Sequence, residues 1–290
     1  MNEMKTPGAL NRRKFLQVGV GSCTAVAAMA LPRSGTAALT KTPRESGDGL
    51  KIGLTSYTLR KYNLDEALTL TKEAGVKYIS LKDMHLPLKS NKAECEEAHR
   101  KIEAAGLTLM GGGVIYMKNN PQQLRSDFDY AKNAGMPTII CSPEPDALDE
   151  IEKLAKEYDI RIAIHNHGPT DKIYPSPLDV LKAVEQRDSR MGLCIDVGHT
   201  VRIGQDPIPI IQTCASRLYD FHMKDVTEAT PKGKAIAVGR GVIDIVGVLQ
   251  TLLRIKYQYQ VALEYEDKAD APVPGMFESF GYLRGVLASI

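Results

Sequence analysis

Short runs of apolar residues alternate with longer segments of helical periodicity along most of this chain. From Leu50 onward, each apolar run predicts a buried strand, and each following segment predicts an amphipathic helix. The strands are expected to begin near Ile52, Tyr78, Leu107, Thr138, Arg161, Gly192, Leu218 and Gln260. The helices are expected near Leu64–Ala74, Lys92–Ala105, Gln122–Ala134, Ala147–Tyr158, Pro177–Gln186, Pro207–Ala215, Ile243–Ile255 and Met276–Ala288.

Three of these helices end in the same Ala-Gly joint directly before a strand, at Gly75, Gly106 and Gly135. Glycine just past a helix end takes the left-handed conformation without a Cβ penalty. The repeated joint indicates serial βα units and a parallel sheet. Eight strands and eight helices favour a closed (β/α)8 TIM barrel over a doubly wound open sheet. No glycine-rich dinucleotide fingerprint follows the first strand.

Side chains on a strand alternate between two faces, and in a barrel only one face points into the lumen. In the run around residue 164, Ile162 and Ile164 share the outward face, which leaves His165 and His167 in the lumen. The same parity in the other strands places Tyr219, Phe221 and Met223 outward and gives a lumen set of Lys82, Asp196, Asp220, His222, Lys224, Glu264 and Glu266. These polar residues stand at carboxyl ends of strands, where barrel active sites are built.

Asp196, His222 and Glu264 converge from successive strands, with His165 beside them. Burying several carboxylates together is costly unless a cation neutralises them. A mixed histidine and carboxylate set suits Mn²⁺, Mg²⁺, Co²⁺ or Zn²⁺, and the residues do not choose among these ions. The sequence therefore predicts a divalent metal held by His165, Asp196, His222 and Glu264.

Residues 1–38 differ in composition from the rest. The run N-R-R-K-F-L at 11–16, followed by an apolar stretch to Leu31, predicts a twin-arginine export signal and a periplasmic location. Gly21 argues against lipid anchoring at Cys23. Residues 39–50 form a polar linker and residues 51–290 the barrel.

Without residues 1–38 the chain holds 32 basic and 34 acidic residues, a net charge of −2. This balance gives no support for nucleic-acid binding. No later apolar run is long enough to span a membrane, so no stable insertion is expected after the signal is removed. Cys141 and Cys194 fall in expected core strands and are predicted to be buried free thiols. Homo-oligomerisation is left open.

Four motifs resemble the xylose isomerase-like barrel superfamily, the sugar phosphate isomerase/epimerase group. They are Ile195–His199, Phe221–Asp225, Gly239–Gly241 and Leu263–Glu266. The resemblance implies that Asp196, His222 and Glu264 bind a divalent metal and that His199 contacts substrate. It further implies that the Gly-Arg-Gly loop closes over the site, where Arg240 binds a hydroxyl or anionic group.

One position departs from that pattern. Epimerases of the superfamily end the fifth strand in a glutamate, whereas this chain has His165, followed by Asn166 and His167. The resemblance thereby extends to relatives with a His-x-His strand, which include inosose dehydratase-like proteins. We assign Glu264 as ligand and base and His165 as ligand or second acid/base. Lys224 is assigned a catalytic role as an electrostatic partner of substrate oxygens. The residues assigned to substrate binding are His167, His199, Arg240 and Lys82.

The expected activity is a divalent-metal-dependent carbohydrate isomerase or epimerase that abstracts a proton next to a sugar carbonyl. A second hypothesis is a dehydratase or lyase acting on keto-sugars or keto-glycosides at the same metal site. A third is a non-catalytic sugar-binding barrel. The partner in each case is a small carbohydrate. An abasic-site endonuclease, also found in the superfamily, is disfavoured because a net charge of −2 offers no excess of basic residues for DNA binding.

Overall fold

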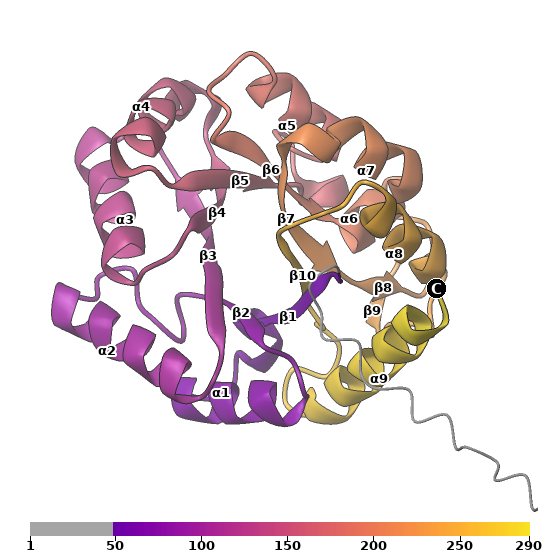
Figure 1. The fold of residues 1–290 in the computed structure, drawn as a ribbon. Coiled ribbons are helices and arrows are strands. Elements are labelled where there is room, and N and C mark those ends of the chain that lie inside the picture. Colours follow the sequence, from indigo (N-terminus) through magenta and orange to yellow (C-terminus); the bar gives the residue numbers. More distant parts are fainter. Residues whose placement is uncertain (1–48) are drawn as a thin grey trace, which may run out of the picture. The chain divides into compact units, whose positions relative to one another are not determined.

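The computed structural model describes residues 49–290, in which eight parallel strands close into a barrel in the order β1-β10-β7-β6-β5-β4-β3-β2 (Figure 1). The strands are β1 (Lys51–Thr55), β2 (Tyr78–Leu81), β3 (Thr108–Met117), β4 (Thr138–Pro143), β5 (Arg161–His165), β6 (Met191–Asp196), β7 (Leu218–Met223) and β10 (Gln260–Leu263). The prediction of a (β/α)8 TIM barrel is confirmed. The predicted signal and nearly all of the linker lie outside the described residues.

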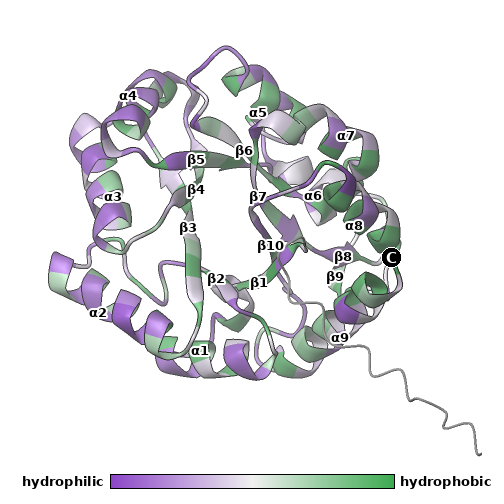
Figure 2. Cartoon of the chain, viewed as in Figure 1, coloured by the Kyte–Doolittle hydropathy of each residue, from purple (hydrophilic) through white to green (hydrophobic). Residues whose placement is uncertain are grey.

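Helices surround the strands in Figure 1 and follow the predicted order. They are α1 (Leu64–Glu73), α2 (Lys92–Ala104), α3 (Pro121–Asn133), α4 (Leu148–Tyr158), α5 (Pro177–Val184), α7 (Pro207–Cys214), α8 (Ile245–Arg254) and α9 (Val273–Ser289). Most carry both hydrophilic and hydrophobic positions in Figure 2, as expected for helices with one face on a sheet. In the part of the chain that the structure describes, no helix is long and apolar enough to cross a membrane.

Local signals explain where these helices start and stop. Asn63 and Asn91 each form a capping box at the start of α1 and α2, with Glu66 and Glu94 three residues later. The three Ala-Gly joints behave as predicted, because Gly75, Gly106 and Gly135 have φ angles of 74°, 77° and 73°.

Several short elements were not predicted. Helix α6 (Val197–Arg202) follows β6 directly, and a two-stranded hairpin of β8 (Asp225–Val226) and β9 (Ala235–Ile236) follows β7. Single 3₁₀ turns, η1 (Ser56–Leu59), η2 (Pro145–Ala147), η3 (Gly168–Thr170) and η4 (Ala215–Arg217), complete the connections. These elements are too short to show a hydrophobic period, but several of them shape the mouth of the barrel.

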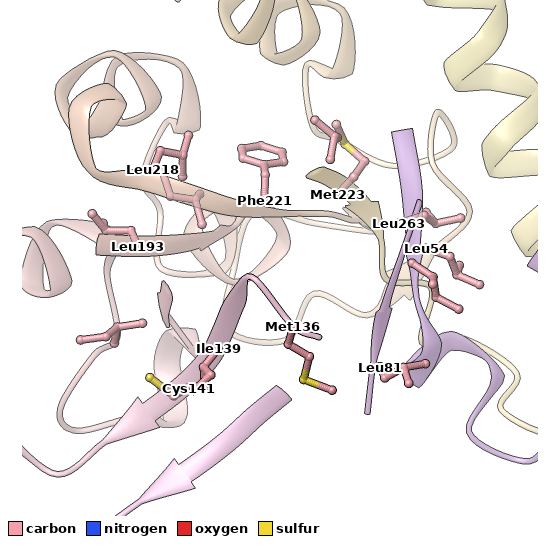
Figure 3. Close-up of a cluster of buried hydrophobic side chains, with 14 of the residues drawn as sticks. Leu54, Leu81, Met136, Ile139, Cys141, Leu193, Leu218, Phe221, Met223 and Leu263 are labelled. Carbon is pink, nitrogen blue, oxygen red and sulfur yellow. The ribbon is translucent and has the colours of Figure 1, made fainter. Parts of the chain in front are cut away.

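The main core lies between the strands and the helices. Leu54 of β1 and Leu263 of β10 pair across the sheet and lie side by side in Figure 3. Phe221 and Met223 project from β7 into the same layer, and all four side chains are fully buried. This layer fixes the outward parity of the strands and so turns the opposite, polar positions toward the lumen.

A smaller cluster of Ile140, Ala163, Cys194 and Tyr219 packs apart from this layer. The prediction that Tyr219 lies on the outward face is wrong, because its ring belongs to this smaller cluster. The ladder between β6 and β7 shifts register, so that Leu193 pairs with Leu218 but Cys194 pairs with Asp220. The extra residue is Tyr219, and the shift turns its ring toward Ala163 and Cys194. The cysteines at 95, 141, 194 and 214 are free and buried, as predicted for Cys141 and Cys194.

Candidate metal centre

Four buried side chains from consecutive barrel strands meet at the carboxyl end of the sheet. His165 ends β5, Asp196 ends β6, His222 lies near the end of β7, and Glu264 follows β10 directly. Each offers one ligand atom, and these atoms all lie within 4.8 Å of one another. The register aligns them, since Asp196 pairs with His222 across β6 and β7. The structure thus brings together the complete predicted metal set.

Three of the spacings between these atoms match those of adjacent ligands around one ion. His222 Nδ1 lies 3.0 Å from His165 Nε2 and 3.2 Å from Glu264 Oε2. His165 Nε2 lies 3.5 Å from Asp196 Oδ2, which accepts no aligned hydrogen bond although it is fully buried. Ligand atoms about 2.0–2.2 Å from a shared ion stand roughly 3–3.5 Å apart at tetrahedral or octahedral angles. The four residues therefore fit a divalent metal.

Lys224 supplies the positive charge nearest to these carboxylates. Its Nζ lies 2.9 Å from Asp196 Oδ2, 2.8 Å from Glu264 Oε2 and 2.7 Å from Glu266 Oε1. Burial raises the pKa of Asp196 and of Glu264, but the Lys224 ammonium acts together with the neighbouring histidines to outweigh burial. Both pKa values are held well below their usual range. Both carboxylates are consequently ionised at neutral pH and available as ligands.

The two histidines of the centre differ in charge. Burial lowers the pKa of His222, but the carboxylates of Glu264, Asp220 and Asp196 overcome that effect and raise the pKa to about 9. Burial dominates at His165 and holds its pKa well below the usual value. At neutral pH, His222 is therefore an imidazolium and His165 is neutral. Metal binding through His222 requires release of its proton.

Asp196 also builds the wall beside the centre. Its Oδ1 accepts a hydrogen bond from the backbone N–H of His199 at 2.8 Å and caps α6, while Oδ2 faces the other ligands. Gly198, in the first turn of α6, packs closely against the end of β7, since a Cβ there would lie 3.0 Å from the Cβ of Lys224. These contacts explain the spacing of the motif Ile195–His199, because the cap fixes His199 next to the metal ligand.

A cavity of about 200 Å³, the inner pocket, lies over this centre. Six predicted site residues line it: Lys82, His165, His167, His199, Lys224 and Glu264. Lys82 Nζ is held 3.1 Å from the Val114 carbonyl and 2.9 Å from Asp83 Oδ1. Tyr57 and Tyr116 also line the inner pocket and were not predicted, because neither follows the lumen parity of a recognised strand end.

Asp196 and His222 belong to the ligand cluster without lining the inner pocket, whereas Arg240 belongs to neither the cluster nor the pocket lining. Its side chain is exposed and pairs with Glu278 of α9. The Asp225 carboxylate holds the surrounding loop, since it accepts hydrogen bonds from the backbone N–H groups of Gly239, Gly241 and Ile243. A contact of Arg240 with substrate stays a prediction that needs this loop to move.

Comparisons with known proteins agree with this architecture. The profile of the xylose isomerase-like TIM barrel family matches residues 68–286. An inosose dehydratase of Clostridium beijerinckii is 27% identical over 207 residues, which cover 62% of this chain and 64% of that protein. An inosose dehydratase of Clostridium tetani is 28% identical over 41% of this chain and 45% of its own length. The chain thus spans less than two thirds of these curated relatives.

Solved structures show the same fold. An uncharacterised protein of Parabacteroides distasonis is 25% identical, with a TM-score of 0.64 over 81% of this chain and 98% of its own. The 3-keto-D-glucoside 4-epimerase YcjR of E. coli is 16% identical, with a TM-score of 0.67 over 81% of this chain and 99% of its own. The IolI protein, solved with a zinc atom, is 17% identical, with a TM-score of 0.72 over 83% and 99%. The family profile covers about three quarters of this chain, which therefore belongs to the xylose isomerase-like TIM barrel family.

Proposed function

We propose that the protein is a divalent-metal-dependent lyase that removes a β-hydroxyl or β-glycosyl group from a keto-sugar. The observation that carries this proposal is the asymmetry of the centre. A carboxylate, Glu264, stands on the β10 side, and imidazoles from β5 and α6 stand on the other side, where His165, His167 and His199 have ring centroids 4.4–6.0 Å apart. The curated inosose dehydratases support the same reaction class.

Glu264 is assigned as the proton acceptor. Its Oε1 accepts a hydrogen bond from Thr55 Oγ1 at 3.2 Å, and its Oε2 lies beside Lys224. Those contacts fix the carboxylate at the rim of the inner pocket in its ionised form. The proton next to the sugar carbonyl passes to Glu264, and the electrons of the broken C–H bond form an enolate.

The imidazoles are assigned to the leaving group. The enolate expels the β-oxygen with the electron pair of the breaking C–O bond, and that oxygen takes a proton from a ring N–H of His167 or His199. Burial lowers the pKa of both rings, so the charged ring is the minor form at neutral pH and a stronger acid than a free imidazolium once it is formed. The products are an unsaturated ketone and either water or the released alcohol.

The metal has one role in this scheme. When held by His165, Asp196, His222 and Glu264, a divalent ion polarises the sugar carbonyl and stabilises the negative charge that develops on its oxygen. Lys224 and Lys82 also line the inner pocket and add positive charge there.

Epimerisation or isomerisation is the second candidate. His165, at the end of β5, and Glu264, directly after β10, both contact Nδ1 of the His222 ring. The centre therefore has two groups that can exchange a substrate proton. An imidazole in place of the second carboxylate makes the two faces unequal. That inequality favours elimination over a symmetric two-carboxylate epimerisation.

The test is an incubation of Mn²⁺-loaded protein with a panel of keto-sugars and keto-glycosides in D₂O, followed by NMR. We expect deuterium incorporation next to the carbonyl and accumulation of an eliminated product. Epimers without elimination would support the second candidate. If no substrate in the panel gives either an epimer or an eliminated product, only the hypothesis of a non-catalytic sugar-binding protein is left. Glu264→Gln should abolish exchange, whereas Glu157→Gln, on the surface of α4, should retain it.

We also propose, from residues 11–31, that the protein is exported through the twin-arginine route. Phosphorylated sugars are scarce outside the cytoplasm, which favours a neutral carbohydrate as substrate. The approximately balanced charge of the barrel is consistent with such a substrate.

A further inference from the structure

A second cavity adjoins the inner pocket and is larger. This outer pocket, of about 440 Å³, lies between the ends of β3 and β4 and the loop that follows η3. Tyr116 and His167 line both cavities, so the two pockets share a wall. The inner pocket, at about 200 Å³, is smaller than the range of roughly 300–1,000 Å³ that is typical of small-molecule sites, and the two together fall within it.

The shared wall is an exposed aromatic ring. Tyr116 is 69% exposed, the largest exposed fraction among the large hydrophobic side chains of the described residues. Its ring is stacked on His167, with centroids 5.9 Å apart and planes inclined by 25°. The pair is thereby held as a platform whose other face is open. The apolar C–H face of a pyranose ring packs well on the electron-rich face of such a ring.

The charges around the outer pocket are balanced. Lys118 and Lys172 line it together with Glu144 and Asp171. In the described part of the chain, Lys118, Glu144 and Lys172 form no ion pair, so their polar ends are available to hydroxyl groups. Two cations opposed by two anions do not favour a phosphate or nucleotide, because a strongly anionic group selects a cationic site. A neutral polyol fits this lining.

We propose that the outer pocket binds a second sugar unit, linked to the sugar that reacts over the metal centre. The preferred substrate is then a disaccharide, and the outer unit is the group that an elimination would release. This inference rests on the proposed function only in placing a sugar in the inner pocket. Its observable is binding, which requires no turnover.

The test measures dissociation constants by ligand-observed NMR for the Mn²⁺-loaded full chain. The probes are glucose and methyl glucoside, compared with cellobiose, maltose and trehalose. We expect at least one disaccharide to bind about tenfold more tightly than glucose, since one added stacking contact is of that order. Equal affinities, or no detectable binding of any disaccharide, would overturn the proposal.

Two variants locate the added affinity. Thr170→Trp places a large ring at the rim of the outer pocket, and Thr170 does not line the inner pocket. It should abolish the preference for the disaccharide and leave glucose binding intact, while Thr213→Trp, exposed on α7, should change neither. A preference that survives Thr170→Trp contradicts the proposed subsite. If the unmodified protein binds the disaccharide more tightly but exchanges no substrate proton in D₂O, the result contradicts the proposed lyase activity and still supports the subsite.

Discussion

His165 Nε2 lies 3.0 Å from His222 Nδ1, although their strands are not neighbours in the barrel. The two rings reach across Asp196 on the intervening strand. Two ring nitrogens at this distance need either a shared proton or a shared cation between them. In the protein without metal the proton belongs to His222, whose pKa is raised to about 9. This relationship makes proton and metal direct competitors for the same position.

The first prediction follows from that competition. Below a pH of about 9, metal binding must displace one proton from His222, so the apparent affinity should fall by about tenfold for each pH unit below that value. Calorimetric titration with Mn²⁺ at pH 7 in buffers of different ionisation enthalpy should show release of about one proton per ion. An affinity that is constant between pH 6 and pH 8 contradicts the assignment of His222 as a ligand.

The second prediction concerns Lys224. Lys224→Met leaves buried carboxylates of Asp196 and Glu264 without their cation, which should destabilise the metal-free protein by about 3–5 kcal/mol. Added Mn²⁺ should restore a large part of that loss, because it supplies the missing positive charge. Urea unfolding with and without the ion measures both effects.

Lys153→Met is the matched control, since Lys153 pairs with Glu150 on an exposed face of α4. That pair contributes at most about 1 kcal/mol. If Lys224→Met destabilises no more than Lys153→Met, the ammonium does not neutralise the centre.

The third prediction concerns the loop that carries Arg240. Asp225→Ala removes the carboxylate that accepts hydrogen bonds from the backbone N–H groups of Val226, Gly239, Gly241 and Ile243. The loss of these four bonds should cost about 3–4 kcal/mol of stability. Amide exchange at Gly239 and Gly241 should accelerate more than exchange in the strands. Asp206→Ala, which removes one helix cap at α7, should cost only about 1 kcal/mol and leave the loop unchanged.

A fourth prediction tests export. The double replacement Arg12→Lys and Arg13→Lys should retain the protein in the cytoplasm, because the twin-arginine route reads the arginine pair. Cell fractionation measures the distribution, with Lys14→Arg as the control that leaves both arginines in place. Unchanged export of the double variant contradicts the proposed signal.

Much of the fold and the site could be predicted from the sequence because both depend on local periodicity. Alternating side chains placed His165 and Glu264 on the lumen face, and Ala-Gly joints fixed the order of βα units. Tyr219 was misplaced because a register shift between two strands depends on their backbone pairing and leaves no mark in either strand alone. The position of Arg240 depends on distant hydrogen bonds to Asp225, which periodicity does not record.

The outer pocket was also beyond sequence analysis. Tyr116 lies within β3, and the wall it forms with His167 of the chain after β5 arises only when β3, β4 and β5 close side by side. The same closure places the pocket next to the metal centre. The size of the substrate pocket therefore depends on contacts between elements far apart in the chain, which the pattern of a single strand does not indicate.

The central claim is that one ion is shared by His165, Asp196, His222 and Glu264. Equilibrium titration of the metal-free protein with Zn²⁺ and with Mn²⁺ tests it most directly. We predict one tight site per chain and a loss of affinity of about 10²-fold or more in His165→Ala, since removal of a second-shell partner alone costs about 10–100-fold. His99→Ala, on the outer helix α2, should bind normally. Absence of a tight site, or unchanged affinity in His165→Ala, would contradict the claim.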